Sequence, residues 1–527
     1  MSPSNIKSPG VYINELDAFS NSVVPVASAV PAFIGYTPQA MYQGKSYAHV
    51  AQKISSFSEF KAFFCYPDAP APASEVKQYN PGYYLLQQQS QPTDPGYVVI
   101  NSNYYSVLPD PNTIYYLYNS VKMFYENGGG YAYIVSVGTY GAPLNSPMAL
   151  GTQLINPNVK LKDLTDGLAL LVNEQEPTMY ICPEATLLSV ADNGALMRAM
   201  LLQCKETQTA MSVFDVIGGR NPDPILYTED IQTFRDNTGQ VGLDYGAAYY
   251  PFIGTTTMRT SDIDYTNLFG GDTKQLAPLL NPADHPNPAA AQILANIENP
   301  SGTRLTVAQY HNALINASET YRNIINQVLA VANILPPSGA MAGIITNIDN
   351  HYGPWQAPAN VSIVGATSLP INLSENQHAN LNIDTVSGKS INAIRSFKGI
   401  GILVWGARTL DSNSQDWRYI PTRRTMTFLE QSCKLACRTY VFQPNDNTTW
   451  DAVKSMLSSF LTNIWKEGGL MGATPADAFS VDCGLGTTMT GDDILKGIMT
   501  VAISVAPTRP AQFIEFTIQQ QMQVQRL

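Results

Sequence analysis

The spacing of apolar and polar residues changes several times along the chain, and these changes predict mixed α and β structure. Val23–Tyr36 is almost continuously apolar, which is typical of a buried strand. Ser55–Phe64 and Ile114–Asn127 have apolar residues at helical spacing. The glycines at 128–130 end the second of these helices, and Tyr131–Val137 is expected to follow as a strand.

Residues 160–350 alternate helical stretches with short apolar runs, and this alternation predicts an α/β sheet with a covered face. Residues 66–112 differ, because Pro, Tyr, Gln and Asn are frequent there. Their many turn-forming residues predict an insertion made of loops on an outer surface.

The last quarter of the chain has the clearest pattern. Ile400–Gly406 is predicted as a buried strand, and Thr425–Arg438 and Trp450–Trp465 are predicted as helices. Thr449 is expected to cap the last of these helices, and Gly468 to end it. One face of that helix is apolar through Trp450, Val453, Leu457, Phe460, Leu461 and Ile464.

Both ends of the chain contain short extended patterns. The run Val11-Tyr12-Ile13 follows a Pro-Gly breaker pair. At the other end, Pro507 and Pro510 rule out a continuous helix before the final residues. A terminal strand needs a sheet to join, either in its own subunit or in another. Alternation with period two places three apolar residues on one face of this strand: Ile514, Phe516 and Ile518.

Composition adds that much of the surface is uncharged. Hydrophobic residues make up 44% of the chain and charged residues only 13%, whereas a typical soluble domain has roughly 25% charged residues. Because interface cores are depleted of charge, this composition suits a protein that buries its exterior against other copies. It also fits an ordinary globular surface with few charges.

The net charge of -11 argues against a general nucleic-acid binder, since phosphate contacts need Lys and Arg. The cluster Arg418, Arg423 and Arg424 is too small to reverse that conclusion. We expect these three arginines to form local salt bridges or to meet an acidic partner surface.

Membrane and disulfide signals are weak. The first residues lack the apolar core of a secretory signal, and no apolar stretch is long enough to span a bilayer. The best candidates, 399–407 and 498–506, are interpreted as buried strands. Six cysteines in so long a chain are expected to be reduced thiols, which predicts assembly in the cytoplasm.

Candidate enzyme features are few. Gly486–Thr490 (GTTMT) is similar to a serine-protease nucleophile motif, but threonine stands where the motif needs serine. Cys433 and Cys437 share a helix face, yet two further zinc ligands are missing nearby. No dinucleotide-binding or Walker-type loop occurs. We therefore predict no catalytic, cofactor or metal site. None of the five histidines has a recognisable triad context: His49, His285, His311, His351 and His378.

Several segments resemble the contractile tail-sheath family in the family's own order. Ser8–Leu16, Val26–Thr37 and Phe124–Val137 carry the early part of the resemblance. Residues 115–335 otherwise resemble it weakly, and the insertion does not resemble it. The densest match comprises Pro336–Asp349, Gly353–Asn360, Ile391–Leu410, Trp417–Ser432, Phe442–Trp450, Gly472–Phe479, Thr488–Gly497 and Val505–Ile518.

The resemblance implies an α/β and α+β multidomain fold. Its central α/β domain would have a subtilisin-like topology, and its C-terminal α+β domain would be completed by strands from neighbouring subunits. An insertion domain would point outwards. The expected divisions are an N-terminal extended arm (1–22), an N-terminal sheath region with the insertion (23–160), the central domain (161–412), a tube-facing domain (413–510) and a C-terminal arm strand (511–527).

The resemblance also implies a structural role without catalysis. The subunit would polymerise helically around an inner tube in an extended metastable state, then contract to drive the tube through a target envelope. Lys454, Lys466 and Glu467 are candidate tube-facing residues, on a helix whose apolar face also suits a domain core. The residues expected to add strands to neighbouring subunits are Val11, Tyr12, Ile13, Phe513, Ile514, Phe516 and Ile518.

The implied partners are other copies of the chain, the inner tube, and baseplate and tail-terminator or cap proteins. No cofactor, nucleic acid or direct membrane insertion is expected. The particle would assemble in the bacterial cytoplasm as a phage tail or phage-tail-like machine that is released or membrane-anchored. The alternative is a non-contractile hydrolase or surface-binding protein on a similar α/β core.

Overall fold

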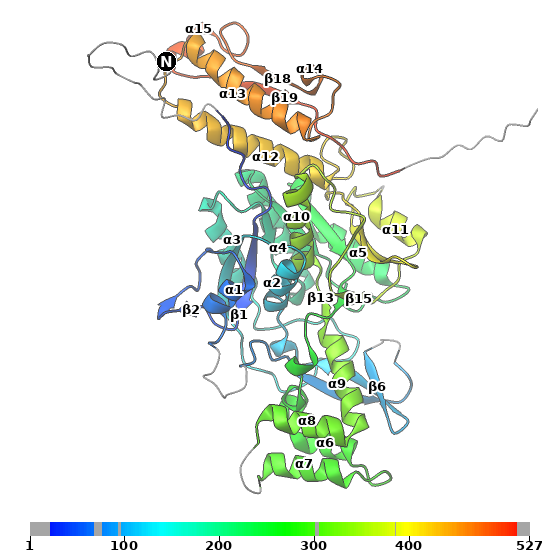
Figure 1. Ribbon diagram of the computed structural model, residues 1–527. Coiled ribbons are helices and arrows are strands. Elements are labelled where there is room, and N and C mark those ends of the chain that lie inside the picture. The colour runs from blue at the N-terminus through cyan, green and yellow to red at the C-terminus, as the bar shows by residue number, and fades with distance from the viewer. Residues whose placement is uncertain (1–21, 68–75, 93–95, 301–304, 385, 514–527) are drawn as a thin grey trace, which may run out of the picture. The chain divides into compact units, whose positions relative to one another are not determined.

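The computed structural model of the protein describes residues 22–67, 76–92, 96–300, 305–384 and 386–513 (Figure 1). The chain divides into two compact units. Unit 1 contains the N-terminal residues up to Val26 together with Phe428–Thr508. Unit 2 contains Ala27–Thr427 and the residues from Arg509 onwards.

Unit 2 is built on a large sheet with the strand order β14-β17-β16-β11-β10-β9-β1-β8-β4. Neighbouring strands from β16 to β8 are parallel, whereas β17, β14 and β4 pair antiparallel at the edges. The strands are β1 (Pro31–Thr37), β4 (Gln52–Ile54), β8 (Ala132–Thr139), β9 (Met179–Ile181), β10 (Met211–Asp215), β11 (Gly246–Tyr250), β14 (Val361–Ser362), β16 (Asn392–Phe397) and β17 (Gly401–Trp405).

The central strands β1, β9, β10 and β11 are buried along their whole length. Helices connect them, which is why these strands are apolar runs rather than alternating ones. The connecting helices are α1 (Phe57–Phe64), α2 (Leu117–Glu126), α3 (Leu161–Ala169), α4 (Val190–Thr207), α5 (Tyr227–Asn237), α10 (Ser338–Tyr352) and α11 (Glu375–Asn382). The mixed α/β architecture predicted from the sequence is confirmed.

A helical group is inserted between two short strands of unit 2 (Figure 1). Strand β12 pairs with both β13 and β15. The elements are β12 (Ile253–Thr255), α6 (Thr273–Leu280), α7 (Pro288–Glu298), α8 (Val307–Ala317), α9 (Glu319–Ala332), β13 (Ile334–Leu335) and β15 (Ala366–Ser368).

The insertion at 66–112 is not only loops, which corrects the expectation from its composition. It contains an antiparallel sheet of β5 (Tyr83–Gln88), β7 (Asn103–Pro109) and β6 (Tyr97–Ile100), and α9 contacts β6 and β7. Tyr83 and Tyr84 are buried here. Flanking Pro and Gln residues conceal the strand pattern in the sequence, and part of the tyrosine content is used for packing. A small hairpin, β2 (Met41–Tyr42) with β3 (Lys45–Ser46), precedes it.

Helices α2 and α10 pack with their backbones unusually close. A Cβ atom added to Gly339 would lie 2.4 Å from the carbonyl oxygen of Ser120. One added to Gly343 would lie 2.4 Å from the carbonyl oxygen of Phe124. The spacing of these two glycines, one turn apart on α10, therefore serves helix packing.

Two buried carboxyl groups cap these helices from the ends of neighbouring strands. Glu184 Oε1 accepts the backbone N–H of Leu117 at 2.8 Å, at the start of α2. Asp215 accepts the N–H of Ser338 at 2.8 Å and its hydroxyl at 2.5 Å, at the start of α10. Because burial disfavours the charged form, it raises the pKa of both groups to about 7.

This burial predicts a pH-dependent stability. A carboxyl group whose pKa is raised by folding favours the folded state while it is protonated, so stability should fall as pH rises from about 4 to about 7. Glu184→Gln keeps the accepting oxygen and removes the charge. We expect this variant to be more stable than the parent by about 1–3 kcal/mol at pH 8 and nearly equal to it at pH 4, measured by urea unfolding. Exposed Asp166→Asn is the control, and an equal change in both variants would contradict the assignment.

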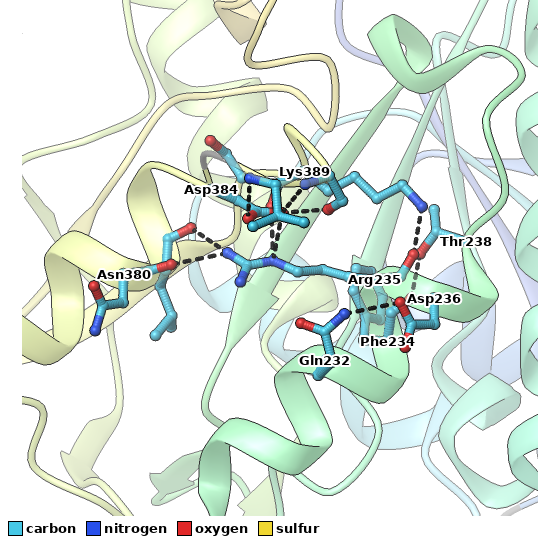
Figure 2. Close-up of polar contacts among 12 residues, drawn as sticks. Gln232, Phe234, Arg235, Asp236, Thr238, Asn380, Asp384 and Lys389 are labelled. Carbon is cyan, nitrogen blue, oxygen red and sulfur yellow. Dashed lines mark hydrogen bonds and ion pairs between the residues drawn. The ribbon is translucent and has the colours of Figure 1, made fainter.

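A second polar network fixes the end of α5 to the segment before β16 (Figure 2). Arg235 donates to the carbonyl oxygens of Lys389 at 3.0 Å and Asn380 at 2.9 Å. It also lies 3.5 Å from the carboxylate of Asp384. The buried Lys389 ammonium group donates to the carbonyl oxygen of Arg235. Two cations near the C-terminal end of α5 interact favourably with the negative end of the helix dipole. The network therefore stabilises the attachment of α5 to the segment before β16.

Candidate assembly surfaces

Unit 1 has a small apolar core, and many of its other apolar side chains are exposed. It contains the second half of α12, three further α-helices and two strands. Helix α12 begins at Ile420, five residues before the predicted Thr425, and Pro421 lies in its first turn, where proline is compatible with a helix. The elements are α12 (Ile420–Cys437), α13 (Asn447–Lys466), α14 (Pro475–Ala478), β18 (Phe479–Asp482), α15 (Gly491–Leu495) and β19 (Ala502–Val505).

The apolar face of α13 is the core of this unit, as one reading of the sequence proposed. All six residues predicted for that face are buried, together with Met456. The predicted cap at Thr449 is wrong by three positions, because Asp446 accepts the N–H of Thr449 at 3.0 Å. A short polar side chain just before the helix is the better N-cap. Gly468 follows the last turn with a φ of 89°, as a terminating glycine requires.

The candidate tube-facing residues do not form one cluster. Lys454 pairs with Asp451 at 2.8 Å on the same helix. Lys466 and Glu467 are exposed together at the helix end, about three turns away from Lys454. Of these three residues, only Lys466 and Glu467 are exposed next to each other, so only they could contact a partner together.

Strands β18 and β19 form an antiparallel sheet that contains no third strand among the described residues. Phe479 pairs with Val505 and Val481 with Ile503, and β18 contacts α13. The sequence segment 498–506 was predicted as a buried strand, but β19 is largely exposed. The outer edge of a strand carries backbone N–H and C=O groups that another strand can pair with, so the outer edges of β18 and β19 are candidate sites for strand addition.

The chain segment that leads towards its C-terminal end is anchored. The N–H of Met471 donates to the carbonyl oxygen of Ala506 at 2.7 Å in unit 1. In unit 2, Arg408 donates to Gln512 Oε1 through two nitrogens, at 2.9 and 2.7 Å. Phe513 is the last described residue, and its side chain is 69% exposed. The predicted arm residues Val11, Tyr12, Ile13, Ile514, Phe516 and Ile518 lie outside the described residues.

Two arginines of the cluster make local salt bridges, one of the two outcomes expected from the sequence, and Arg418 donates to the carbonyl oxygen of Ser412 at 2.9 Å. Arg424 binds both carboxylate oxygens of Asp349, at 2.7 and 2.5 Å, and donates to the carbonyl oxygen of Ser28 at 2.9 Å. Arg423 lies 3.6 Å from Asp244 and stacks over Trp417. These contacts fix the start of α12 in unit 2.

Sequence reasoning missed the role of Asn127 in the Asn-Gly-Gly turn. Its amide accepts from the N–H of Val364 at 2.8 Å and donates to the carbonyl oxygen of Val364 at 3.4 Å. The side-chain amide thus makes the same two hydrogen bonds to the Val364 backbone that a residue of a neighbouring strand would make. The Asn-Gly pair after an amphipathic helix is a signal for such a turn, but it does not identify the partner.

The candidate enzyme features have structural partners. The hydroxyl of Thr488, in the GTTMT segment, donates to the carbonyl oxygen of Thr500 at 2.7 Å. His351 and His378 bond to backbone carbonyl oxygens, and His311 bonds to Tyr321. Burial raises the pKa of Cys433 to about 12, and all six cysteines are free thiols.

The described residues contain neither a metal-binding cluster nor a helix that could span a membrane. No group of three or more acidic, histidine or cysteine side chains is placed to hold a metal ion. No described helix combines the length and apolar character needed to cross a bilayer.

Comparisons with known proteins find similarity to tail sheath proteins. Residues 412–521 match the family described as the phage tail sheath C-terminal domain. A tail sheath protein of Vibrio phage KVP40 is 27% identical over 183 residues, which is 34% of this chain and 26% of that relative. The match therefore spans about a quarter of the curated relative's length.

Solved structures extend the likeness to almost the whole chain. The contracted PVC sheath complex, from an extracellular contractile injection system, has a TM-score of 0.58 at 22% identity and covers 98% of both chains. The contracted helical sheath of the anti-feeding prophage has a TM-score of 0.56 at 23% identity, with 98% of this chain and 99% of that chain covered. These similarities show a shared fold.

Proposed function

We propose, from the premise that this chain is a sheath protein of contractile injection systems, that it polymerises helically around an inner tube. The polymer would assemble in an extended metastable state and then contract, driving the tube through a target envelope. The observation that carries the proposal is the incomplete β18–β19 sheet in a domain with the sheath C-terminal sequence.

Strand addition explains how such a polymer can stay connected while its subunits move. An arm strand from another copy would pair with the open edge of β18 or β19, and its alternate side chains would fix the register. Ile514, Phe516 and Ile518 would supply the apolar face of one arm, with Phe513 on its opposite face, and residues 11–13 would supply the other arm. Each joint gains burial and hydrogen bonds but loses chain entropy. The net gain per joint is therefore modest, and the lattice repeats it at every subunit.

Contraction is then a shift between two packings of one lattice, in which the arms keep neighbouring subunits joined. The C-terminal domain, 413–510, would face the tube. Within it, exposed Lys466 and Glu467 are the favoured contact residues, whereas the charge of Lys454 is compensated by Asp451. The arms would be 1–22 and 511–527.

The proposal extends to the roles of the other domains, the partners and the place of assembly. The parallel strands of unit 2 and their connecting helices support a subtilisin-like central domain (161–412), with the insertion of region 23–160 directed outwards. The chain would act without catalysis or cofactor. Its partners would be other copies, a tube, a baseplate and a cap protein. Assembly would take place in the bacterial cytoplasm, for a particle that is released or anchored.

The test is to express the chain alone and with its tube protein, and to view both samples by negative-stain electron microscopy. We expect helical tubes of uniform width, or monomers that form such tubes on concentration. A hydrolase or surface-binding protein would remain a compact particle under all of these conditions, and that result would contradict the proposal.

A further inference from the structure

Unit 1 has five exposed apolar side chains around two loops, one that follows α12 and one that follows α15. Leu435 lies in the last turns of α12, Val441 and Phe442 follow it in the loop to α13, and Leu495 and Ile498 lie at the end of α15. All five side chains are exposed, Phe442 completely at 102% and Leu495 at 86%. We call these five residues the apolar track.

The two loops of the apolar track are held together. Asn445 donates to the carbonyl oxygen of Ile498 at 3.0 Å, and Trp450 donates to the side-chain oxygen of Asn445 at 2.7 Å. Phe442 has a φ of 72°, the left-handed region that bulky residues rarely adopt. A strained backbone that presents a completely exposed aromatic ring is typical of a contact site.

The N-terminal segment runs along α12 towards this track. The carbonyl oxygen of Ser28 accepts from Arg424 at 2.9 Å, and the N–H of Val26 donates to Ser432 Oγ at 3.2 Å. Passing backwards from Ser28 to Val26, the chain therefore moves from Arg424 to Ser432, towards the C-terminal end of α12. Val23 is still buried, at 9% exposure.

Simple lengths show how far the preceding residues can reach. From Val26 back to Asn21, an extended chain covers about 16 Å at roughly 3.3 Å per residue. From Ser432 to the end of α12 at Cys437, a rise of about 1.5 Å per residue gives about 8 Å, and the 3-10 turn Arg438–Tyr440 adds about 6 Å at roughly 2 Å per residue. The residues just before Ser22 are therefore within reach of Val441 and Phe442. Three of the residues available there are apolar: Leu16, Ala18 and Phe19.

We propose that the apolar track is the docking surface for residues 16–21 of the same chain, with Phe19 packing against Phe442. The docked segment gives the arm a fixed point of departure from its own subunit, beside the end of α12. That consequence rests on the proposed function. The docking itself does not, since it is a property of the free chain.

The test uses the full chain as a dilute monomer with the photo-crosslinking residue p-benzoylphenylalanine at Phe442. Equal amounts of ordinary and ¹⁵N-labelled protein are mixed before irradiation, and the crosslinks are mapped by mass spectrometry. We expect crosslinks to residues 16–21 that join only peptides with the same isotope label. The same substitution at Leu485, exposed in the same unit, is the control and should give no crosslink to this segment.

A second measurement keeps the proposal testable if the crosslinker perturbs the loop. Chymotryptic cleavage after Leu16 and Phe19 should be about fivefold faster or more in Phe442→Ser, and unchanged in Leu485→Ser. Crosslinks of mixed isotope label, crosslinks elsewhere, or equal cleavage in both variants would overturn the inference. If the expected crosslinks form but the chain does not assemble into tubes, the result would contradict only the proposed function.

Discussion

Removing residues 514–527 should abolish ordered tubes while the subunit remains folded. The truncation is placed after Phe513 so that Gln512 still accepts both hydrogen bonds from the buried Arg408. The deleted segment contains Ile514, Phe516 and Ile518, the apolar face of the proposed arm strand. Without it, the lattice would lose one strand joint at every subunit. Electron microscopy reports the tubes, and circular dichroism with thermal unfolding reports the fold.

A matched pair of triple variants separates the effect of the arm's apolar face from that of its polar face. Changing Ile514, Phe516 and Ile518 to serine should abolish tubes as the truncation does. Changing Glu515, Thr517 and Gln519 to alanine should leave them, because these side chains lie on the opposite face. Deletion of Met1–Glu15 should also abolish tubes. Normal tubes from both truncations would refute the arm assignment.

Replacing Arg424 with alanine should destabilise the chain by about 3–5 kcal/mol, the loss typical of breaking a buried ion pair. Arg424 binds Asp349 through two nitrogens, and the side chain of Asp349 is only 1% exposed. The variant would leave a buried carboxylate with only the Ser28 hydroxyl, at 2.5 Å, from this cluster. Urea unfolding measures the change.

Two further variants test the cause of this effect. Arg424→Lys keeps the charge but not the two-point geometry, so its loss should be smaller but measurable. Asp349→Leu combined with Arg424→Met removes both charges, and it should be more stable than Arg424→Ala. Arg418→Ala is the control, because Arg418 donates only to the carbonyl oxygen of Ser412 in the contacts seen here. A loss below about 1 kcal/mol for Arg424→Ala would contradict the assignment.

Periodicity predicted elements well where one face was apolar. The helix around Trp450 is confirmed because its buried residues recur at helical spacing. The strand at Tyr131 is confirmed as β8, since a buried parallel strand is an apolar run. The inserted sheet was missed, because the tyrosines and glutamines of 83–88 do not form a simple apolar alternation.

Long-range partners could not be predicted from spacing. Nothing near Arg424 in the sequence points to Asp349, and nothing near Asn127 points to Val364. Burial of β19 was overestimated because its residues are apolar, whereas exposure depends on which neighbours cover the strand. The strand order, rather than this exposure, leaves a sheet edge for another strand, because β18 and β19 have no third strand among the described residues. The strand pairing of the arms remains a prediction.

The central claim is that the ends of each chain complete the β18–β19 sheets of other copies. A cryo-electron microscopy map of the assembled tubes tests it most directly. The account predicts β18 and β19 extended by strands traced to residues 11–13 and 513–518 of adjacent subunits. A map in which both segments pair only within their own subunit, or in which the sheet stays two-stranded, would contradict it.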